Sequence, residues 1–507
     1  MDALKTAIVI AYVAVLLYIA VHSARRTRST SDFFLGGRSI GPWISAFAYG
    51  TTYFSAVLFV GYAGKLGWSY GFGTLWIVAG NVLVGTLLAW AFLARRTRRM
   101  TVRMNALTMP EFLEARYESA ALKRFSAAVI FLFLLPYSAS VYMGLSYLFE
   151  NVLHIDYSQA LVAMAALTAI YLVTGGYIAV TLTDFVQGTI MLAGSFLLVI
   201  FVVLRAGDAG GAGITGAIEA VRNAQVSQPP NGPPAWLGLL SLVILTSVGP
   251  LGLPQMVQKF YSVKGEPVIG KAAVISTIFA LACTFGAYFS GAFTRAFYTS
   301  AQVKEIGADN LMPALINDFL PAALTTIILL LILSASMSTL SSLVLVSSSA
   351  VAIDLAGGEA RLGERKSTFL MRLLCAMFVA VSLLIALKPW TFIVNMMAIS
   401  WGTVTGSFIA PYIYGLFWKK ATRAGAWAAM LTGTACSLGL SVGLSAWWSG
   451  SVGRSFSLST PWVPFAGAVS MLAPLAVLPL VSLFTRRPSP GAMELAFGGA
   501  GSGAEEA

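Results

Sequence analysis

The chain carries a run of hydroxyl residues inside an apolar segment, at 334–342 (SASMSTLSS). Positions 335, 338, 339 and 342 fall on one face of a helix, because they are spaced i, i+3, i+4 and i+7. Ser338, Thr339 and Ser342 then present three hydroxyl oxygens on one stripe, and such ligands suit a hard monovalent cation. The alternative is that these small residues only pack against neighbouring helices and bond back to their own backbone.

Asp184 is an acidic residue between two apolar runs, 159–180 and 185–204. A carboxylate inside a membrane-spanning segment is by default a functional hypothesis. The alternative is an acid at the start of a helix, stabilised by the helix dipole. If Asp184 faces the hydroxyl stripe, it supplies the negative charge for a second cation.

Two apolar segments contain signals that break helices. Segment 46–55 places Gly50 and two β-branched threonines in the middle of a span, and segment 247–255 contains Pro250 and Pro254. A proline removes a backbone donor and obstructs the preceding turn, which frees carbonyl groups for other partners. The alternatives are a glycine packing contact in the first segment and a simple kink in the second.

Two tyrosines accompany these breaks. Tyr53 lies at the first break, and Tyr137 follows a proline within the run 125–149. Each offers an aromatic wall and a hydroxyl to a small solute, or serves only as packing.

The composition indicates what holds these residues in place. Of 507 residues, 58% are hydrophobic and 10% are charged, which excludes a soluble multidomain enzyme, intrinsic disorder and a disulfide scaffold. A membrane-spanning helix needs about 20 apolar residues. We therefore predict an all-α membrane protein with about thirteen transmembrane helices, at the charge-free runs 6–21, 42–64, 70–94, 125–149, 159–180, 185–204, 236–258, 272–294, 319–353, 373–387, 389–418, 424–453 and 455–485.

The net charge of +12 reflects membrane topology rather than a nucleic-acid partner. With the N-terminus outside, most Lys and Arg residues fall in loops on the cytoplasmic side, including a loop that holds Lys259, Lys264 and Lys271. This orientation predicts a multi-pass protein of the plasma or inner membrane with a cytoplasmic C-terminus.

The two broken spans are five spans apart, so each begins a five-helix unit and the second unit has inverted topology. We expect one transporter domain at 1–490, with repeats at 42–204 and 236–418 and flanking helices at 4–21, 424–447 and 464–485. Run 319–353 is expected to form one long tilted helix, 205–235 a polar loop and 491–507 a disordered cytoplasmic tail. The pairs Gly402/Gly406 and Gly439/Gly443 predict close helix contacts.

Common catalytic motifs are missing from the sequence. The nearest candidate for a nucleotide-binding loop, 358–363, is followed by Glu364 instead of lysine, and no His-Glu-x-x-His occurs. The Gly-rich stretch 211–216 follows no strand signal, so it does not predict a nucleotide site. We expect no enzyme, no nucleotide partner and no organic cofactor.

Four stretches resemble the sodium:solute symporter family, whose proline, pantothenate, monocarboxylate and sugar branches share a thirteen-helix fold with inverted repeats. They are 35–42 (LGGRSIGP), 106–112 (ALTMPEF), 174–187 (TGGYIAVTLTDFVQ) and 332–342 (ILSASMSTLSS). The resemblance covers roughly residues 30 to 450. It implies an amino-acid/sodium symporter-like fold and sodium as the coupling ion.

The resemblance also implies site residues. A first sodium would bind the backbone oxygens of Thr51, Phe54 and Ala335 and the hydroxyls of Ser338 and Thr339. A possible second sodium would bind at Asp184, Ser338, Ser341 and Ser342. The substrate pocket would be walled by Tyr53, Tyr137 and the segment from Thr246 to Gln255, including Pro250 and Pro254.

Some positions depart from the family pattern. Proline-type members carry an aspartate where this chain has Tyr53, and aromatic residues where it has Thr246 and Pro250. Sugar-type members line the pocket with amides and charged groups, whereas this segment offers only Gln255. These departures favour a small solute that carries its own carboxylate, a monocarboxylate or small amino acid.

We therefore predict a secondary active, sodium-coupled symporter of a small organic solute that works by alternating access in a lipid bilayer. The alternatives are a proton-coupled transporter that relies on Asp184 and a sensor that keeps the transporter fold without coupled transport.

Overall fold

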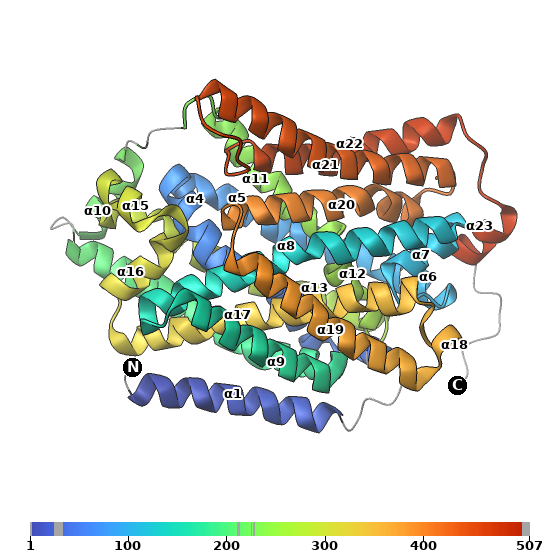
Figure 1. Ribbon diagram of the computed structural model, residues 1–507, viewed down its shortest axis with the longest axis horizontal. Coiled ribbons are helices and arrows are strands. Elements are labelled where there is room, and N and C mark those ends of the chain that lie inside the picture. Colours follow the sequence, from blue (N-terminus) through green and yellow to red (C-terminus); the bar gives the residue numbers. More distant parts are fainter. Residues whose placement is uncertain (1–2, 25–33, 210–212, 225, 227–228, 499–507) are drawn as a thin grey trace.

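The computed structural model describes residues 3–24, 34–209, 213–224, 226 and 229–498. Within these ranges the protein is helical, and only an isolated bridge joins Ile40 and Val263. Most of the longer helices run along the long axis of the molecule in Figure 1, and several of them, such as α11 and α19, are tilted to it. They are α1 (Ala3–Ala24), α8 (Ala120–Leu153), α9 (Tyr157–Ala209), α11 (Ala235–Val248), α13 (Glu266–Ala292), α17 (Ala322–Ser349), α19 (Glu364–Leu387), α20 (Ile393–Phe417), α21 (Arg423–Ser451) and α22 (Val463–Leu483).

Shorter helices complete the bundle and connect its members. They are α3 (Pro42–Tyr53), α4 (Ala63–Tyr70), α5 (Leu75–Val82), α6 (Arg95–Arg103), α7 (Met109–Tyr117), α10 (Gly213–Asn223), α12 (Pro254–Ser262), α14 (Thr294–Phe297), α15 (Ser300–Ile306), α16 (Leu311–Phe319), α18 (Gly358–Leu362) and α23 (Pro490–Phe497). Single 3-10 turns lie at Gly36–Arg38, Gly71–Thr74, Gly249–Leu251 and Ala308–Asn310, and π-helical stretches at Val57–Tyr62, Leu83–Ala94 and Ala350–Leu355. Helices α6 and α7 lie at one end of the bundle and α15 and α16 at the other, hereafter the α7 end and the α16 end (Figure 1).

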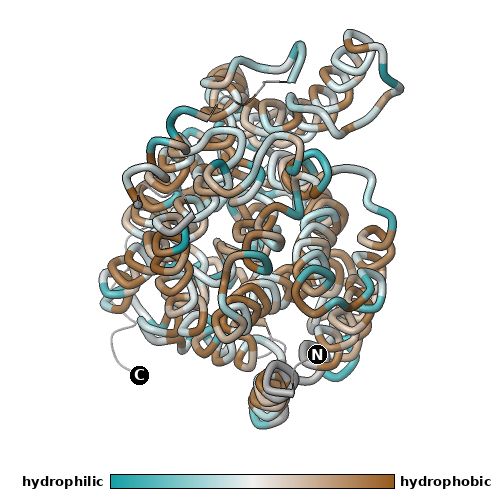
Figure 2. The backbone as a smooth tube through the Cα atoms, turned by 90° about the vertical axis from the view of Figure 1, so that its left-hand side faces the viewer, coloured by the Kyte–Doolittle hydropathy of each residue, from teal (hydrophilic) through white to brown (hydrophobic). Residues whose placement is uncertain are grey.

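Ten helical segments of the described chain are long and apolar enough to cross a membrane. Figure 2, which looks at the α16 end, shows hydrophobic residues along the helices and most hydrophilic residues in the connections. The predicted all-α membrane architecture is confirmed, but the count of thirteen is not. Some expected spans do not stand as separate long helices, because α9 joins two of them and α3 is a short, interrupted helix.

Helices α17 and α20 form the centre of the bundle, and nearly all of their residues are buried. Helix α17 packs against α3, α8, α9 and α19. It continues through the π-helical stretch to Leu355, so the expected single long helix at 319–353 is present, beginning at Ala322. Its hydroxyl stripe is therefore held in the core of the protein.

The first predicted break occurs directly after α3. The helix begins with Pro42 at its first position, where the missing N–H is not needed, and ends as Phe54 adopts an extended conformation. Gly50 has a different role, because a Cβ at this position would come within 2.3 Å of the Phe279 ring on α13. The segment therefore contains both alternatives: a close glycine contact and, four residues later, a true break.

The second predicted break separates α11 from α12. Helix α11 ends at Val248, a 3-10 turn follows at Gly249–Leu251, and α12 begins with Pro254 at its first position. Both prolines stand at the start of a helix. Each lacks a backbone N–H, so it ends the hydrogen bonding of the preceding helix, and its fixed φ suits the first turn of the helix that follows. The break expected from the prolines is confirmed.

Helix α9 changes direction at Gly176, where the φ of +61° is outside the helical range. Asp184 lies more than two helical turns beyond this point and its side chain is fully buried. The first-turn alternative for Asp184 is therefore wrong.

Two expectations about the connections need correction. The segment after 205 is not only a loop, because α9 extends to Ala209 and α10 covers Gly213–Asn223. The tail is not disordered from 491 onward: α23 packs on α6 and α7, and Arg103 donates a hydrogen bond to the Ala496 carbonyl. Residues 499–507 lie outside the described residues, as do Arg25, Arg26 and Arg28, whose charges the predicted orientation places on the cytoplasmic side.

The two predicted glycine pairs behave differently. A Cβ on Gly406 would lie 2.6 Å from the Ser470 carbonyl oxygen, and one on Gly402 would lie 2.8 Å from the Cα of Gly467. In contrast, a Cβ on Gly439 or Gly443 would meet nothing within 4 Å. The predicted helix contact is confirmed for the first pair and wrong for the second.

Candidate functional site

The hydroxyl stripe of α17 meets the broken end of α3. The Thr339 hydroxyl lies 3.1 Å from the carbonyl oxygen of Thr51 and 3.3 Å from that of Thr52, and donates to them. These carbonyls belong to the last turn of α3, where the helix supplies no further N–H groups to receive them. Because a hydroxyl both donates and accepts, the same oxygen can also serve a cation held beside the carbonyls.

Asp184 reaches the same stripe from α9. The Ser338 hydroxyl donates a 2.6 Å hydrogen bond to Asp184 Oδ1, and neither residue is exposed. Asp184 Oδ2 and the Thr51 hydroxyl are buried without a hydrogen bond. The carboxylate therefore faces Ser338 through Oδ1, while Oδ2 accepts no hydrogen bond.

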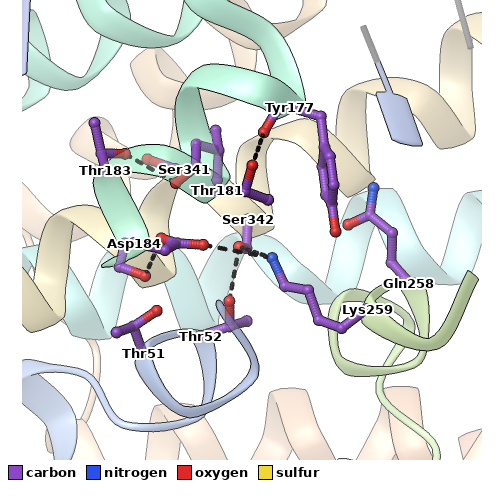
Figure 3. A network of polar contacts seen from close by, with 12 residues as sticks. Thr51, Thr52, Tyr177, Thr181, Thr183, Asp184, Gln258, Lys259, Ser341 and Ser342 are labelled. Carbon is purple, nitrogen blue, oxygen red and sulfur yellow. Dashed lines mark hydrogen bonds and ion pairs between the residues drawn. The ribbon is translucent and has the colours of Figure 1, made fainter. Parts of the chain in front are cut away.

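Lys259 enters this cluster from α12. Its ammonium nitrogen donates to the Ser342 hydroxyl at 3.1 Å and lies 3.8 Å from Asp184 Oδ2. Only 1% of the lysine side chain is exposed and none of the Asp184 side chain. Figure 3 shows Lys259 pointing at Ser342 and Asp184, with Thr51 and Thr52 approaching from α3.

One hydroxyl pair connects the two parts of the cluster. Thr52 Oγ1 and Ser342 Oγ are 2.9 Å apart, so Ser342 contacts both α3 and the lysine. Ser341 does not take part, because its hydroxyl donates to the Met337 carbonyl of its own helix. Ser341 therefore follows the alternative given for the stripe, in which a hydroxyl bonds back to the backbone of its own helix.

The remaining predicted sodium ligands lie close by in the chain and are buried. Ala335 precedes Ser338 by one helical turn on the same face of α17, and Phe54 is the first residue beyond α3. Of the five predicted residues of the first site, Thr339 and Thr51 are in direct contact between α17 and α3, and Phe54, Ala335 and Ser338 lie within one helical turn of them along the chain.

A small cavity with a volume of about 20 Å³ adjoins the break of α3. Tyr53 and Thr246 line it, and the Tyr53 hydroxyl donates a 2.6 Å hydrogen bond to the Thr246 carbonyl. The other lining residues are uncharged and partly aromatic: Phe54, Ser55, Val57, Leu58, Tyr62, Asn81, Tyr288, Met397 and Trp401. The helix that resumes at Val57 begins at the wall of this cavity.

The other predicted solute residues lie at different distances from the cavity. The Tyr137 ring is 5.6 Å from that of Trp401, so Tyr137 supports a lining residue. Pro250 stands in the turn between α11 and α12 and does not line the cavity.

The first two residues of α12 also lie outside this cavity. Pro254 lines a separate narrow cavity beside Thr108 and Asp354, towards α7. Gln255 is buried, and its side-chain oxygen has no hydrogen bond.

Several site residues were missed from the sequence. Lys259 was assigned to a loop by its charge, although it follows the apolar run 236–258 directly. Asn81 carried a usable signal, since it is a polar residue within the apolar run 70–94. Trp401 and Tyr288 carried none, because aromatic residues are common throughout such spans.

These features define a class of protein. Membrane-length helices surround two broken helices. The broken end of α3 meets a buried cluster of carbonyls, hydroxyls and one carboxylate, and α12, which follows the second break, contributes one ammonium. Within the described residues, no group of three His, Cys, Asp or Glu side chains could hold a metal ion. Such an arrangement is typical of secondary transporters, which bind ions and solutes at helix breaks.

Comparison with known proteins identifies the family. Residues 33–433 match the model of the sodium:solute symporter family, and the chain belongs to this family. It is 31% identical over 425 residues to the high-affinity proline transporter PutP of Bacillus subtilis, covering 83% of this chain and 88% of that protein. It is 32% identical over 433 residues to the sodium/proline symporter of Haemophilus influenzae, covering 83% and 85%. The chain is a multi-pass membrane transporter and not an enzyme.

Solved structures agree on the fold. A Na+-coupled sialic acid symporter superposes with a TM-score of 0.69 at 17% identity, over 96% of this chain and 98% of that one. Mhp1, a nucleobase-cation-symport-1 family transporter, superposes with a TM-score of 0.53 at 13% identity, over 93% and 99%. The expected amino-acid/sodium symporter-like fold is thereby confirmed.

Proposed function

We propose that this protein is a sodium-coupled symporter of a small zwitterionic amino acid, with proline as the first candidate, and that it works by alternating access. The observation that carries the proposal is the contact of Thr339 with the carbonyls of Thr51 and Thr52. It joins the end of a broken helix to the central helix, directly beside a small cavity lined by uncharged side chains.

Sodium would bind at this junction as a co-transported ion. The carbonyl oxygens of Thr51, Phe54 and Ala335 and the hydroxyls of Ser338 and Thr339 supply the hard, neutral oxygen ligands that sodium prefers. Because the ligands come from α3 and α17, a bound ion would hold the two helices together. Its loss would free α3 to move with respect to α17.

The chemistry of the cavity favours a solute without net charge. None of its lining side chains is charged, so a lone charge would remain uncompensated there. A zwitterion avoids this cost: its carboxylate can approach the helix N-terminus at Val57, and Tyr53 and Trp401 offer aromatic faces to an apolar ring. The curated relatives named for proline support the same choice.

The departure at Tyr53 bears on this choice. Proline-type members carry an aspartate there, which could receive an amino group, whereas the Tyr53 hydroxyl is already bonded to Thr246. A monocarboxylate balanced by the bound sodium is therefore the alternative solute.

The orientation follows from charge. Residues 95–103 carry a cluster of arginines at the α7 end, which we place in the cytoplasm of a plasma or inner membrane. The N-terminus is then outside and the C-terminus inside. Each sodium ion that enters gains about 2.3 kcal/mol per 100 mV of membrane potential, which is enough to concentrate a solute.

Uptake into proteoliposomes tests the proposal. An inward sodium gradient should drive accumulation of radiolabelled proline, and an equal potassium gradient should not. Unlabelled amino acids and short monocarboxylates, added as competitors, identify the solute class. Accumulation driven by a pH gradient without sodium would overturn sodium coupling, and competition only by monocarboxylates would overturn the amino-acid assignment.

A further inference from the structure

We propose that the Lys259 ammonium is the resident cation of the Asp184 site, and that it takes the place of a second sodium ion. The protein would then carry one sodium ion per solute molecule. This inference rests on the proposed function, since it concerns the number of ions that accompany the solute.

The geometry of the cluster supports this assignment. A second sodium would need Asp184, Ser338, Ser341 and Ser342 as ligands. In the structure the Ser342 hydroxyl accepts from Lys259 at 3.1 Å, and the Ser341 hydroxyl is bonded to its own helix. Asp184 Oδ2 has the ammonium 3.8 Å away (Figure 3). The lysine thus approaches two of the four expected ligands, and a third is turned away.

The charge balance gives the physical reason. A buried carboxylate needs a positive partner, because desolvation of an unpaired charge is costly. Lys259 provides one positive charge for the one negative charge of Asp184, and the neighbouring side chains that contact them, Ser338, Ser342 and Tyr177, are uncharged. A second sodium would need the Asp184 and Ser342 oxygen atoms that the ammonium already approaches. The ammonium and a second sodium therefore compete for the same ligands.

The first sodium site does not conflict with the lysine. Thr339 and the carbonyls of Thr51 and Thr52 form a contact in which Lys259 takes no part. The two sites share Ser338, whose hydroxyl donates to Asp184 and keeps its lone pairs for a cation. One sodium and one ammonium can thus be present at the same time.

The number of ions can be measured on the unmodified protein. In proteoliposomes, the ratio of radiolabelled sodium to radiolabelled solute taken up should be one. A ratio of two would overturn the inference while leaving the sodium-coupled function intact. Absence of sodium-dependent uptake would instead overturn the proposed function, so the two failures are distinguishable.

Substitution of the lysine gives a second test. Lys259→Met keeps the length of the side chain but removes the charge, which leaves Asp184 free to bind sodium. We expect the number of sodium ions bound per protein at saturation, measured with radiolabelled sodium, to rise from about one to about two. The double variant Asp184→Asn/Lys259→Met removes both charges and should return this number to about one.

Lys264→Met is the matched control, since this lysine is exposed and lies just beyond α12. It should bind sodium as the unmodified protein does. If Lys259→Met is unstable in potassium, sodium should raise its melting temperature more than it raises that of the unmodified protein. A Lys259→Met variant that binds one sodium, or that gains no extra stabilisation from sodium, would overturn the inference.

Discussion

The Tyr53 hydroxyl donates a 2.6 Å hydrogen bond to the carbonyl oxygen of Thr246, and this contact joins the two helices that break. Tyr53 ends α3 and Thr246 lies in the last turn of α11. Both residues line the cavity assigned to the solute. The hydrogen bond therefore links the two walls of that cavity.

Tyr53→Phe should weaken solute binding. The variant keeps the ring but leaves the buried Thr246 carbonyl without this donor, a loss of about 0.5–1.5 kcal/mol. If the contact orients the cavity, we expect KM for the solute to rise by about 2- to 10-fold. Tyr49→Phe is the matched control, because the Tyr49 hydroxyl donates to the Gly85 carbonyl, also at 2.6 Å, and Tyr49 does not line the cavity. Equal KM values for the two variants would contradict a role of Tyr53 in the solute site.

Thr339→Ala should weaken sodium binding. It removes a hydroxyl ligand and leaves the carbonyls of Thr51 and Thr52 without their donor, so the sodium concentration for half-maximal uptake should rise by about 10-fold or more. Thr339→Ser keeps the hydroxyl and should remain close to the unmodified protein. Ser336→Ala, on the same helix but bonded only to its own backbone at Ile332, is the control. An unchanged sodium requirement in Thr339→Ala would remove Thr339 from the site.

Removal of sodium should lower the melting temperature of the purified protein. A ligand at a hundred times its Kd stabilises the folded state by about 2.7 kcal/mol, which differential scanning fluorimetry detects readily. We expect sodium, but not potassium or choline, to raise the melting temperature, and proline to raise it further only when sodium is present. Proline stabilisation that is independent of sodium would argue against coupled binding.

Gly433→Ala should destabilise the packing of α21 on α20. A Cβ at this position would lie 2.1 Å from the Gly406 carbonyl oxygen, so the helices must separate, at a cost of about 1–3 kcal/mol. Gly443→Ala, on the same helix but with nothing within 4 Å of the added atom, should leave the melting temperature nearly unchanged. Similar melting temperatures for the two variants would show that the close approach does not stabilise the fold.

Acidic pH should stabilise the α16 end through Asp309. Burial raises the pKa of this carboxyl above its usual value, despite the opposing charge of Lys65 and the hydrogen bond from the Ile393 N–H. The folded protein therefore binds a proton more tightly than the unfolded chain does. This tighter proton binding adds to the free energy of unfolding at low pH. The contribution is lost as pH rises through the raised pKa of Asp309.

The variant Asp309→Asn isolates this contribution. The gain in melting temperature as pH is lowered from 7 to about 4, the usual range of an aspartate, should be smaller in Asp309→Asn than in the unmodified protein. The exposed Glu305→Gln on α15 serves as the control and should keep the full gain. An identical pH dependence in all three proteins would rule out Asp309 as the source.

The sequence by itself determined the class of fold and the places where helices break. Long charge-free runs must form helices in a membrane, since backbone groups find no other partners there. Pro250 and Pro254 interrupt a helix whatever its tertiary neighbours are, because proline lacks a backbone N–H. The stripe at 335, 338, 339 and 342 follows from helical periodicity alone. These features depend on local residue chemistry, so they could be predicted.

The tertiary structure alone decided which side chains meet. Asp184 and Ser338 are 154 residues apart, and only the packing of α9 on α17 brings them to 2.6 Å. Lys259 was interpreted as a loop charge because lysine is usually solvated, whereas a carboxylate from another helix allows it to be buried. Likewise, a glycine pair in sequence does not specify a neighbour: Gly406 has one and Gly443 does not. Such partnerships join distant segments, and no local pattern encodes them.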